Sequence, residues 1–137
     1  MIQKILCPTD GTDHSAMAVA QAAELSAKYD AALTICVVNV AHGGVRGPTI
    51  SHWTQDEVQK ILDDSVALAR KHGATNPHSV DIISREAAAG IVIYAEENAF
   101  DHIVMGTGDK RGMSRLMLGS VAADVSGRAH CSVTVVR

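Results

Sequence analysis

Short, almost wholly apolar runs alternate along the chain with segments in which apolar residues recur at helical spacing. Each apolar run is expected to be a β-strand, and these runs cover residues 2–9, 32–40, 78–84, 101–105 and 131–136. The run at 32–40, ALTICVVNV, is apolar at nearly every position and rich in β-branched residues. Such a run is typical of a strand that is covered on both faces of a sheet.

Four helices are expected between these strands. Asp13 is the expected N-cap of the first helix, and Thr54 begins the second, three residues before Glu57, in a capping box. The fourth helix is expected from about Gly119 to Arg128. The inward-facing residues recur at intervals of three and four: Ala16, Val19, Ala20, Ala23 and Ala27 in the first helix, Val58, Ile61, Leu62, Ser65, Leu68 and Ala69 in the second, Ala88, Ile91, Val92, Ala95 and Ala99 in the third, and Val121, Ala122 and Val125 in the fourth.

This alternation predicts an α/β fold, in which helices cover both faces of a parallel sheet. We expect one domain over residues 1–137. The pattern does not determine the strand order, but ligands of such sheets bind beyond the carboxyl ends of the strands, at the point where the order reverses. In a 3-2-1-4-5 order, that point lies between the first and fourth strands. The two most polar loops follow these strands, PTDGTDHS at 8–15 and GTGDKRG at 106–112.

Composition and charge narrow the function classes. Apolar residues make up 47% of the chain and aromatic residues only 3%, so the core must be aliphatic. The net charge of −3 argues against a nucleic-acid binder, and no apolar run approaches the ~20 residues of a membrane span. Three widely spaced cysteines form no disulfide framework, and the start of the chain does not resemble a signal peptide. A reducing cytoplasm is therefore the expected location.

Common catalytic and metal-binding motifs are absent from the sequence. There is no P-loop, and the glycines at 106, 108 and 112 miss the dinucleotide-binding spacing by one residue. No pair of histidines or cysteines has metal-ligand spacing. TDHS at 12–15 places triad residue types side by side, but it is better explained as a helix cap. We therefore predict no catalytic residue and no metal site built by such a pair.

Three segments together resemble the universal stress protein family over essentially the whole chain. They are KILCPTDGTDHSAMAVAQAAELS (4–26), YAEENAFDHIVMGT (94–107) and SRLMLGSVAADVSGRAHCSVTVVR (114–137). The resemblance implies a Rossmann-like three-layer fold with a five-stranded parallel sheet in the order 3-2-1-4-5. It also implies a homodimer formed through the last strand, whose edge near Arg137 is expected to be free to pair.

Family members that bind ATP share the motif G-x2-G-x9-G-[ST]. In this chain Gly106, Gly119 and Ser120 fit the motif at the correct spacing. Asp109 stands where the second glycine is expected, and Gly108 lies one position early. A carboxylate about 4 Å from a phosphate charge is repelled by roughly 4 kcal/mol at an effective dielectric near 20, which weakens binding several hundredfold.

Three arrangements would reduce this repulsion. Asp109 would point to solvent, Lys110 and Arg111 would face the phosphates, or a Mg²⁺ ion would bridge Asp109 and the phosphates. Gly119, Ser120 and Val121 at the start of the fourth helix favour an anion, because its free N–H groups and dipole point there. The alternative for the glycine-rich loop is a surface turn with solvated charges, and the alternative for Gly119 and Ser120 is an ordinary helix start.

The resemblance also assigns the nucleoside end of the site. Asp10 would contact the ribose or the adenine, with Pro8 and Thr9 shaping that wall, and the backbone of Val37 would read the adenine edge. Met105 would lie near the ribose and phosphates. The glycine-rich segment 41–53 is expected to be a long loop over the adenine, with Trp53 either a lid residue or an anchor for the following helix. Turn and core roles remain alternatives for Asp10, Val37 and Met105.

The function implied by the resemblance is a small cytoplasmic stress-response protein that binds an adenine nucleotide, ATP in the first instance. It would act as a homodimeric sensor or modulator, with hydrolysis slow at most because no general base or arginine finger is evident. An interaction module of the same family that binds no nucleotide is the alternative, and a nucleotide hydrolase is the third reading. The sequence does not name a protein partner.

Overall fold

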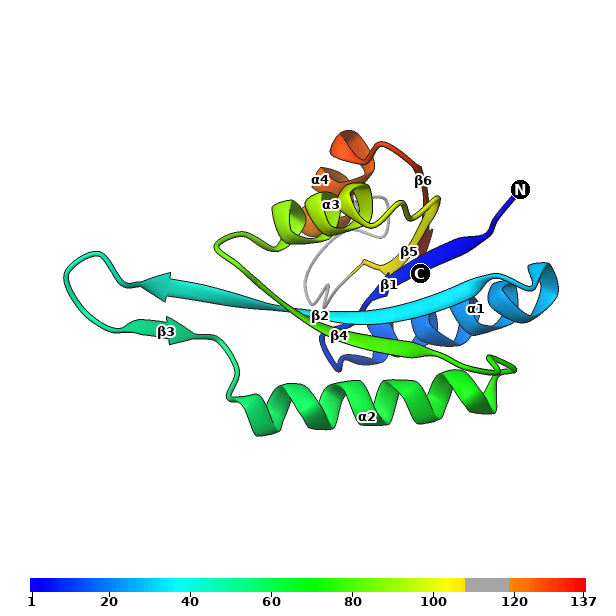
Figure 1. Ribbon diagram of the computed structural model, residues 1–137, viewed down its shortest axis with the longest axis horizontal. Coiled ribbons are helices and arrows are strands. Elements are labelled where there is room, and N and C mark those ends of the chain that lie inside the picture. Colours follow the sequence, from blue (N-terminus) through cyan, green and yellow to red (C-terminus); the bar gives the residue numbers. More distant parts are fainter. Residues whose placement is uncertain (108–118) are drawn as a thin grey trace.

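The structure is a computed structural model that describes residues 1–107 and 119–137. Strands and helices alternate along the chain, as Figure 1 shows. Their bounds are β1 (Lys4–Pro8), α1 (Asp13–Tyr29), β2 (Ala32–Gly43), β3 (Thr49–Ser51), α2 (Gln55–Lys71), β4 (His78–Ser84), α3 (Ala87–Glu97), β5 (His102–Gly106), α4 (Ser120–Arg128) and β6 (Ser132–Val136).

Five of the strands form a parallel sheet in the order β4-β2-β1-β5-β6. This is the 3-2-1-4-5 order of the resemblance, once the short β3 is left out of the numbering. The central strand β1 pairs with β2 on one side and with β5 on the other, so Ile5 lies between Leu33 and His102. The order reverses between β1 and β5, and the predicted ligand position lies at their carboxyl ends.

The helices form two layers, with α1 and α2 on one face of the sheet and α3 and α4 on the other (Figure 1). Alternate residues of each strand therefore enter different cores. In β2, Ile35 and Val37 pack with α1 and α2, whereas Cys36 and Val38 pack with α3 and α4. The predicted α/β, Rossmann-like three-layer architecture with an aliphatic core is confirmed.

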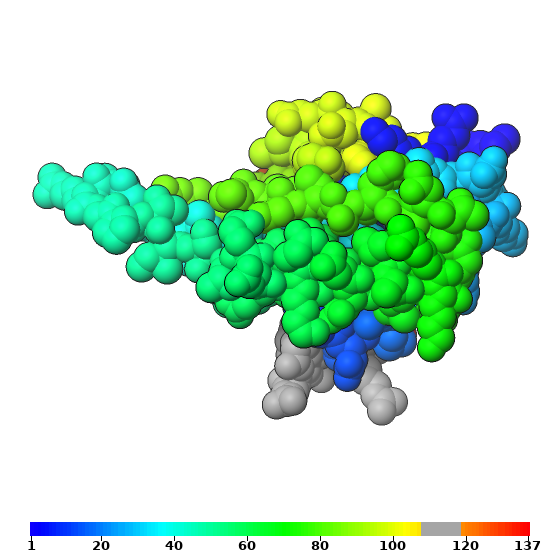
Figure 2. All heavy atoms as spheres, turned by 60° about the horizontal axis from the view of Figure 1, so that its bottom comes forward, coloured from blue at the N-terminus to red at the C-terminus, as the bar shows by residue number. Residues whose placement is uncertain are grey.

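The expectation of a long loop over residues 41–53 is wrong. β2 continues to Gly43 and turns back as β3 in an antiparallel hairpin, with Ala41 opposite Ser51 and Gly43 opposite Thr49. Gly43 and Gly44 have φ of 77° and 92°, which glycine adopts without steric strain. The glycines therefore mark the turn of a hairpin, and this hairpin projects beyond the rest of the molecule (Figure 2).

The helix starts were predicted with mixed success. Thr54 Oγ1 accepts a hydrogen bond from Glu57 N at 3.2 Å, and Glu57 Oε1 accepts one from Thr54 N at 3.0 Å, which confirms the capping box. Asp13 is not the N-cap of α1. Thr12 caps this helix by accepting from Ser15 N at 3.3 Å, and Asp13 occupies the first helical position. An acidic side chain is favourable there because of the helix dipole.

The end of α3 also differs from the prediction. The helix stops at Glu97, and Ala99 lies beyond it with a φ of 56°, outside the helical region. The remaining apolar positions predicted for this helix are inside it, and Ala88, Ile91 and Ala95 are nearly fully buried. Within the described ranges, no helix combines the length and apolar character needed to cross a membrane.

Candidate functional site

A cavity of about 570 Å³ opens at the carboxyl ends of β1 and β5, at the point where the strand order reverses. It is lined by Pro8, Thr9, Asp10, Ser15, Val38, Val40, His42, His52, Trp53, Ala87, Ile91, Met105, Gly106, Thr107, Gly119, Ser120, Val121 and Ala122. These residues come from the ends of β1 and β5, from β2 and the segment after β3, and from the starts of α1, α3 and α4. The volume lies in the range of small-molecule sites, roughly 300–1,000 Å³.

Most of the residues predicted for the site meet in this cavity. They are Pro8, Thr9, Asp10, Met105, Gly106, Gly119, Ser120 and Val121. Gly108 and Asp109 lie outside the described residues, so the proposed metal bridge and the second motif position lie outside them too. Val37 does not line the cavity. Its side chain is fully buried against α1 and α2, and β2 contributes Val38 and Val40 to the cavity instead.

The corner between β1 and α1 is fixed by short-range hydrogen bonds. The buried Thr9 hydroxyl donates to Ser15 Oγ at 2.9 Å, and Ser15 Oγ donates to the carbonyl of Thr12 at 3.0 Å. Asp10 is exposed, and its Oδ1 accepts from Thr12 N at 3.0 Å and from Thr12 Oγ1 at 2.6 Å. These bonds hold the Asp10 carboxylate at the cavity rim, where it can accept hydrogen bonds from ligand hydroxyl groups.

Two of the motif glycines are also required by backbone packing. A Cβ on Gly106 would lie 2.6 Å from the carbonyl oxygen of His14 in α1, and a Cβ on Gly119 would lie 2.0 Å from the carbonyl oxygen of Thr107. Both distances are shorter than any normal contact. Glycine at these positions therefore brings α1 against β5, and the start of α4 against the end of β5, whether or not a ligand binds.

The glycine-bearing end of the cavity suits an anion. Gly119 is the N-cap of α4 and makes no side-chain cap hydrogen bond, and Ser120 and Val121 follow it along the cavity wall. The first N–H groups of a helix have no partner within that helix, and the helix dipole adds a partial positive charge. Phosphate and carboxylate groups bind at such positions.

The opposite end of the cavity is apolar and aromatic. Val38, Val40 and His42 come from alternate positions of β2, and His52 and Trp53 come from the segment after β3. The sequence prediction missed His42 and His52. The period of two along β2 contained the signal for His42, because residues 38, 40 and 42 share one face of the strand.

Trp53 lies both in the cavity wall and against the core. It lines the cavity, and its partly buried side chain also packs against the core beneath α1 and α2. Its ring contacts the ring of His52 edge to face, with centroids 4.6 Å apart. This is a favourable aromatic arrangement. Trp53 thus belongs both to the cavity wall and to the segment that leads into α2.

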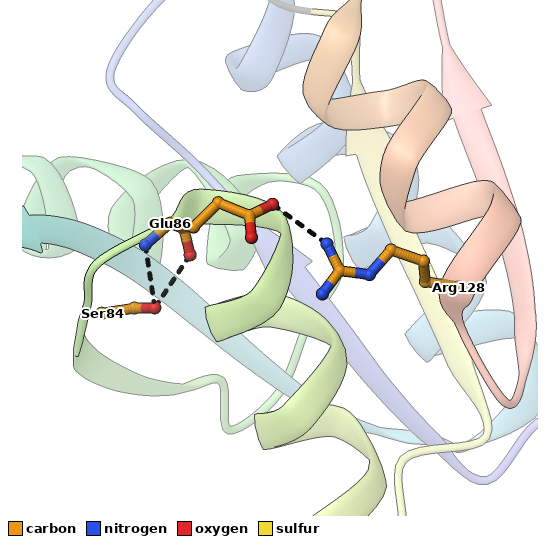
Figure 3. A network of polar contacts seen from close by, with 3 residues as sticks. All are labelled: Ser84, Glu86 and Arg128. Carbon is orange, nitrogen blue, oxygen red and sulfur yellow. Dashed lines mark hydrogen bonds and ion pairs between the residues drawn. The ribbon is translucent and has the colours of Figure 1, made fainter.

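An ion pair joins α3 and α4 beside the cavity (Figure 3). Arg128 Nη1 lies 3.0 Å from Glu86 Oε1, and Ser84 Oγ donates to the carbonyl of Glu86 at 2.8 Å. Both charged side chains are about half exposed, so the pair contributes little stability. Glu86 is the N-cap of α3, and the next residue, Ala87, lines the cavity.

The thiols and potential metal ligands of the described residues can be examined directly. Residues 1–107 and 119–137 contain no cluster of three or more potential metal ligands from histidine, cysteine, aspartate and glutamate. All three cysteines are free thiols. Burial raises the pKa of Cys7 to about 12 and that of Cys36 well above its usual value, so both thiols are protonated at neutral pH. The cavity is suited to an elongated ligand with an anionic group at one end and a flat apolar group at the other.

Comparison with known proteins identifies relatives along the whole chain. The model of the universal stress protein family matches residues 1–137. A universal stress protein of Methanocaldococcus jannaschii is 36% identical over an alignment that covers 100% of this chain and 83% of that protein. The universal stress protein YxiE of Bacillus subtilis is 29% identical, with 100% of both chains covered.

Solved structures agree with the fold. A universal stress protein in complex with cAMP matches with a TM-score of 0.79 and 26% identity, covering 98% of this chain and 97% of that one. A universal stress protein from Archaeoglobus fulgidus in complex with dAMP has a TM-score of 0.70 and 22% identity, with 100% and 98% covered. At that identity, the second similarity shows the fold alone.

Proposed function

Since this chain belongs to the universal stress protein family, we propose that its cavity binds an adenine nucleotide. The observation that carries the proposal is the chemical difference between the two ends of the cavity. One end presents the start of α4 at Gly119 and Ser120, and the other presents Val38, Val40 and Trp53. The structural relative in complex with cAMP supports an adenine base and a phosphate as the two ligand groups.

The proposed orientation follows from this difference. The phosphates lie at Gly119, Ser120 and Val121, where the free N–H groups of α4 favour negative charge. The base lies at the apolar and aromatic end. Asp10, at the rim between the two ends, accepts hydrogen bonds from the ribose hydroxyl groups.

ATP is the nucleotide that we propose in the first instance, with Mg²⁺ as a companion ion. Gly106, Gly119 and Ser120 keep the spacing of the ATP-binding motif, and Asp109 replaces its second glycine. A Mg²⁺ ion between this carboxylate and the phosphates would convert a repulsion into a bridge. The described residues provide no reactive thiolate or metal cluster, so we propose binding, with hydrolysis slow at most.

We propose that the protein acts as a cytoplasmic sensor or modulator and works as a homodimer of single domains, each spanning residues 1–137. The three free thiols support a reducing compartment. Among the described residues, β6 pairs with β5 along one edge and borders no further strand along the other. An edge strand of this kind is a ready template for pairing with a second copy.

Calorimetric titration of the purified protein with ATP, with and without Mg²⁺, tests the proposal. AMP and cAMP titrated in the same way distinguish a triphosphate site from a monophosphate site. We expect micromolar binding of ATP that is strengthened by Mg²⁺. If AMP or cAMP binds with micromolar affinity and ATP does not bind, the proposed adenine site stands and the proposed preference for a triphosphate is wrong.

The competing function is a homodimeric interaction module that binds no nucleotide. The observation that favours it is Asp109, whose charge would oppose a phosphate in the motif. A folded dimer that binds no adenine nucleotide up to millimolar concentration would establish this alternative and overturn the proposed function.

A further inference from the structure

A buried asparagine holds Trp53 from behind the cavity wall. Asn39 in β2 has no exposed surface. Its Oδ1 accepts a hydrogen bond from Trp53 N at 3.0 Å, and its Nδ2 donates one to Trp53 O at 3.0 Å. The side-chain amide thus pairs with both backbone groups of one residue, as the peptide groups of a neighbouring strand would.

Asn39 does not line the cavity itself. Val38 and Val40, on either side of it in β2, both do. Because side chains alternate along a strand, Asn39 points to the opposite face, toward the α1 and α2 layer. Its influence on a bound ligand would therefore act through the segment that it holds.

The same segment has a second tie to β2. The N–H of His52 donates to the carbonyl of Val40 at 2.9 Å, immediately before the paired groups of Trp53. β3 ends at Ser51 and α2 begins at Gln55, so these bonds fix the short connection between the two elements. The connection carries both aromatic rings of the cavity wall, His52 and Trp53.

The energetics favour a positioning role for this pair of bonds. A fully buried amide that lacked partners would be strongly destabilising, and so would the two backbone groups of Trp53 if they lost theirs. An apolar residue in place of Asn39 would therefore release the connection, because its backbone groups would then seek water. The flat indole face would no longer be held at the end of the cavity.

We propose that Asn39 is a positioning residue for ligand recognition. By pairing with both backbone groups of Trp53, it holds the indole as the wall against which an aromatic base lies. The inference rests on the proposed nucleotide function and deepens it, because it assigns selectivity for a planar base to Trp53 and the placement of Trp53 to Asn39. An aromatic wall contacts a planar base over a large area, whereas it has no hydrogen-bond donors along its face for a phosphate chain.

The test compares three ligands on the full chain: ATP, adenosine and inorganic tripolyphosphate, the last measured as a competitor of ATP. In Asn39→Leu we expect adenosine and ATP to bind at least tenfold more weakly, with the affinity for tripolyphosphate changed less than twofold. Trp53 is the only tryptophan of the chain, so its fluorescence reports on this segment alone. Its emission should shift to the red in this variant, and adenosine should no longer alter it.

Ile103→Val is the matched control, because Ile103 is fully buried in β5, belongs to the core beneath α3 and α4 and does not line the cavity. It should lower the melting temperature and leave the emission and the ligand ratio unchanged. Trp53→Ala and Trp53→Phe provide a second series if Asn39→Leu fails to fold. We expect Trp53→Ala to lose adenosine affinity relative to tripolyphosphate, and Trp53→Phe to retain most of it.

The outcomes separate the two proposals. If the wild-type protein binds none of the three ligands, the proposed function fails and the positioning role fails with it. If the wild-type protein binds them, and Asn39→Leu and Trp53→Ala leave the ratio of adenosine to tripolyphosphate affinity unchanged, the positioning role alone is overturned.

Discussion

Gly106 stands at a point where two backbones cross. The position of its absent Cβ lies 2.6 Å from the carbonyl oxygen of His14, the second residue of α1. The close approach seats the start of α1 on the end of β5, and both elements contribute to the cavity lining, α1 through Ser15 and β5 through Met105 and Gly106. The glycine thus shapes the site through packing, and its place in a phosphate motif is not its only explanation.

We expect Gly106→Ala to destabilise the fold by about 2 kcal/mol, in the usual range for forcing an extra methyl group into a packed region. Chemical denaturation measures the change. Gly127→Ala is the control, because no atom lies within 4 Å of the added Cβ and alanine favours a helix over glycine. Equal stability of the two variants would contradict the packing argument.

Asp109 gives a prediction about charge. If its carboxylate opposes the phosphates, Asp109→Gly should tighten ATP binding more than tenfold in the absence of Mg²⁺. If Asp109 bridges through the ion, the same variant should instead weaken binding in the presence of Mg²⁺. Titration calorimetry in both buffers measures these effects. Asp30→Gly is the control, because it removes a carboxylate at a left-handed position outside the cavity lining. Identical ATP affinities of the wild type, Asp109→Gly and Asp30→Gly would show that Asp109 faces away from the ligand.

The cysteines give a prediction about pH. The pKa of Cys7 is raised to about 12 by burial, whereas the thiol ionises near its usual value in the unfolded chain. Between these values the unfolded state binds fewer protons, so this thiol lowers the free energy of unfolding as pH rises, by about 1.4 kcal/mol per pH unit. Denaturation series at pH 8, 10 and 11 should show the decline, and Cys7→Ala should show a smaller one.

At the residue scale, Val37 shows what a strand pattern leaves open: its buried side chain agrees with the core role kept as an alternative, and its backbone role stays a prediction. β2 is apolar on both faces, so its pattern does not reveal which residues face α1 and which face the cavity. The structure places Val37 in one core and Val38 beside the cavity. Asp10 and Thr9 were easier to predict, because polar residues directly after a central strand lie at the ligand edge of a parallel sheet.

Helices and strands can be predicted from the local sequence wherever a helix cap or a regular spacing of apolar residues is clear. The capping box of Thr54 and Glu57 marks the start of α2 in the sequence and in the structure. The hairpin was missed because its second strand, β3, is only three residues long and is exposed at each position. A strand of that length carries no readable period, and only its pairing with β2 defines it.

Thr54→Ala should destabilise the protein by about 1 kcal/mol, the typical effect of removing an N-cap. Hydrogen bonds from Thr54 lower the pKa of Glu57, so the contribution of the capping box is present above the usual glutamate pKa and is lost as pH falls through the lowered one. The largest part of this shift comes from the Thr54 backbone N–H, which Thr54→Ala retains, so the pH dependence is tested on Glu57→Ala: the difference in stability between the wild type and Glu57→Ala should shrink in acid. A thermal melt at pH 7 and at pH 3 measures it, and an unchanged difference would show that Glu57 takes no part in the cap.

At the scale of the whole molecule, the alternation of elements predicts the parallel sheet and its two helical layers. The strand order came from the resemblance, because pairing between strands far apart in the chain has no local signature. The cavity then follows from the order, since β1 and β5 are adjacent only in an arrangement that reverses between them.

The proposed dimer gives a prediction at this scale. Val133 lies in the edge strand β6 and is only partly buried. Val133→Lys should shift the protein from dimer to monomer, because like charges meet across a paired edge. Light scattering measures the molar mass in solution. Ile93→Lys is the control, because Ile93 is exposed on α3 and should tolerate the charge without dissociation; a dimer that survives Val133→Lys would place the interface elsewhere.

The projecting hairpin makes the protein a natural host for a graft. Its tip contains Val45, which is 91% exposed, and hydrogen bonds of Asn39 and Val40 secure its base. Exposed tips of this kind accept inserted sequence with little effect on the domain that carries them. A fluorescent module inserted between Val45 and Gly47 would be attached to the strand that forms one wall of the cavity. Occupancy of the cavity would then be read as an optical signal, and the chain would become a scaffold for a genetically encoded reporter.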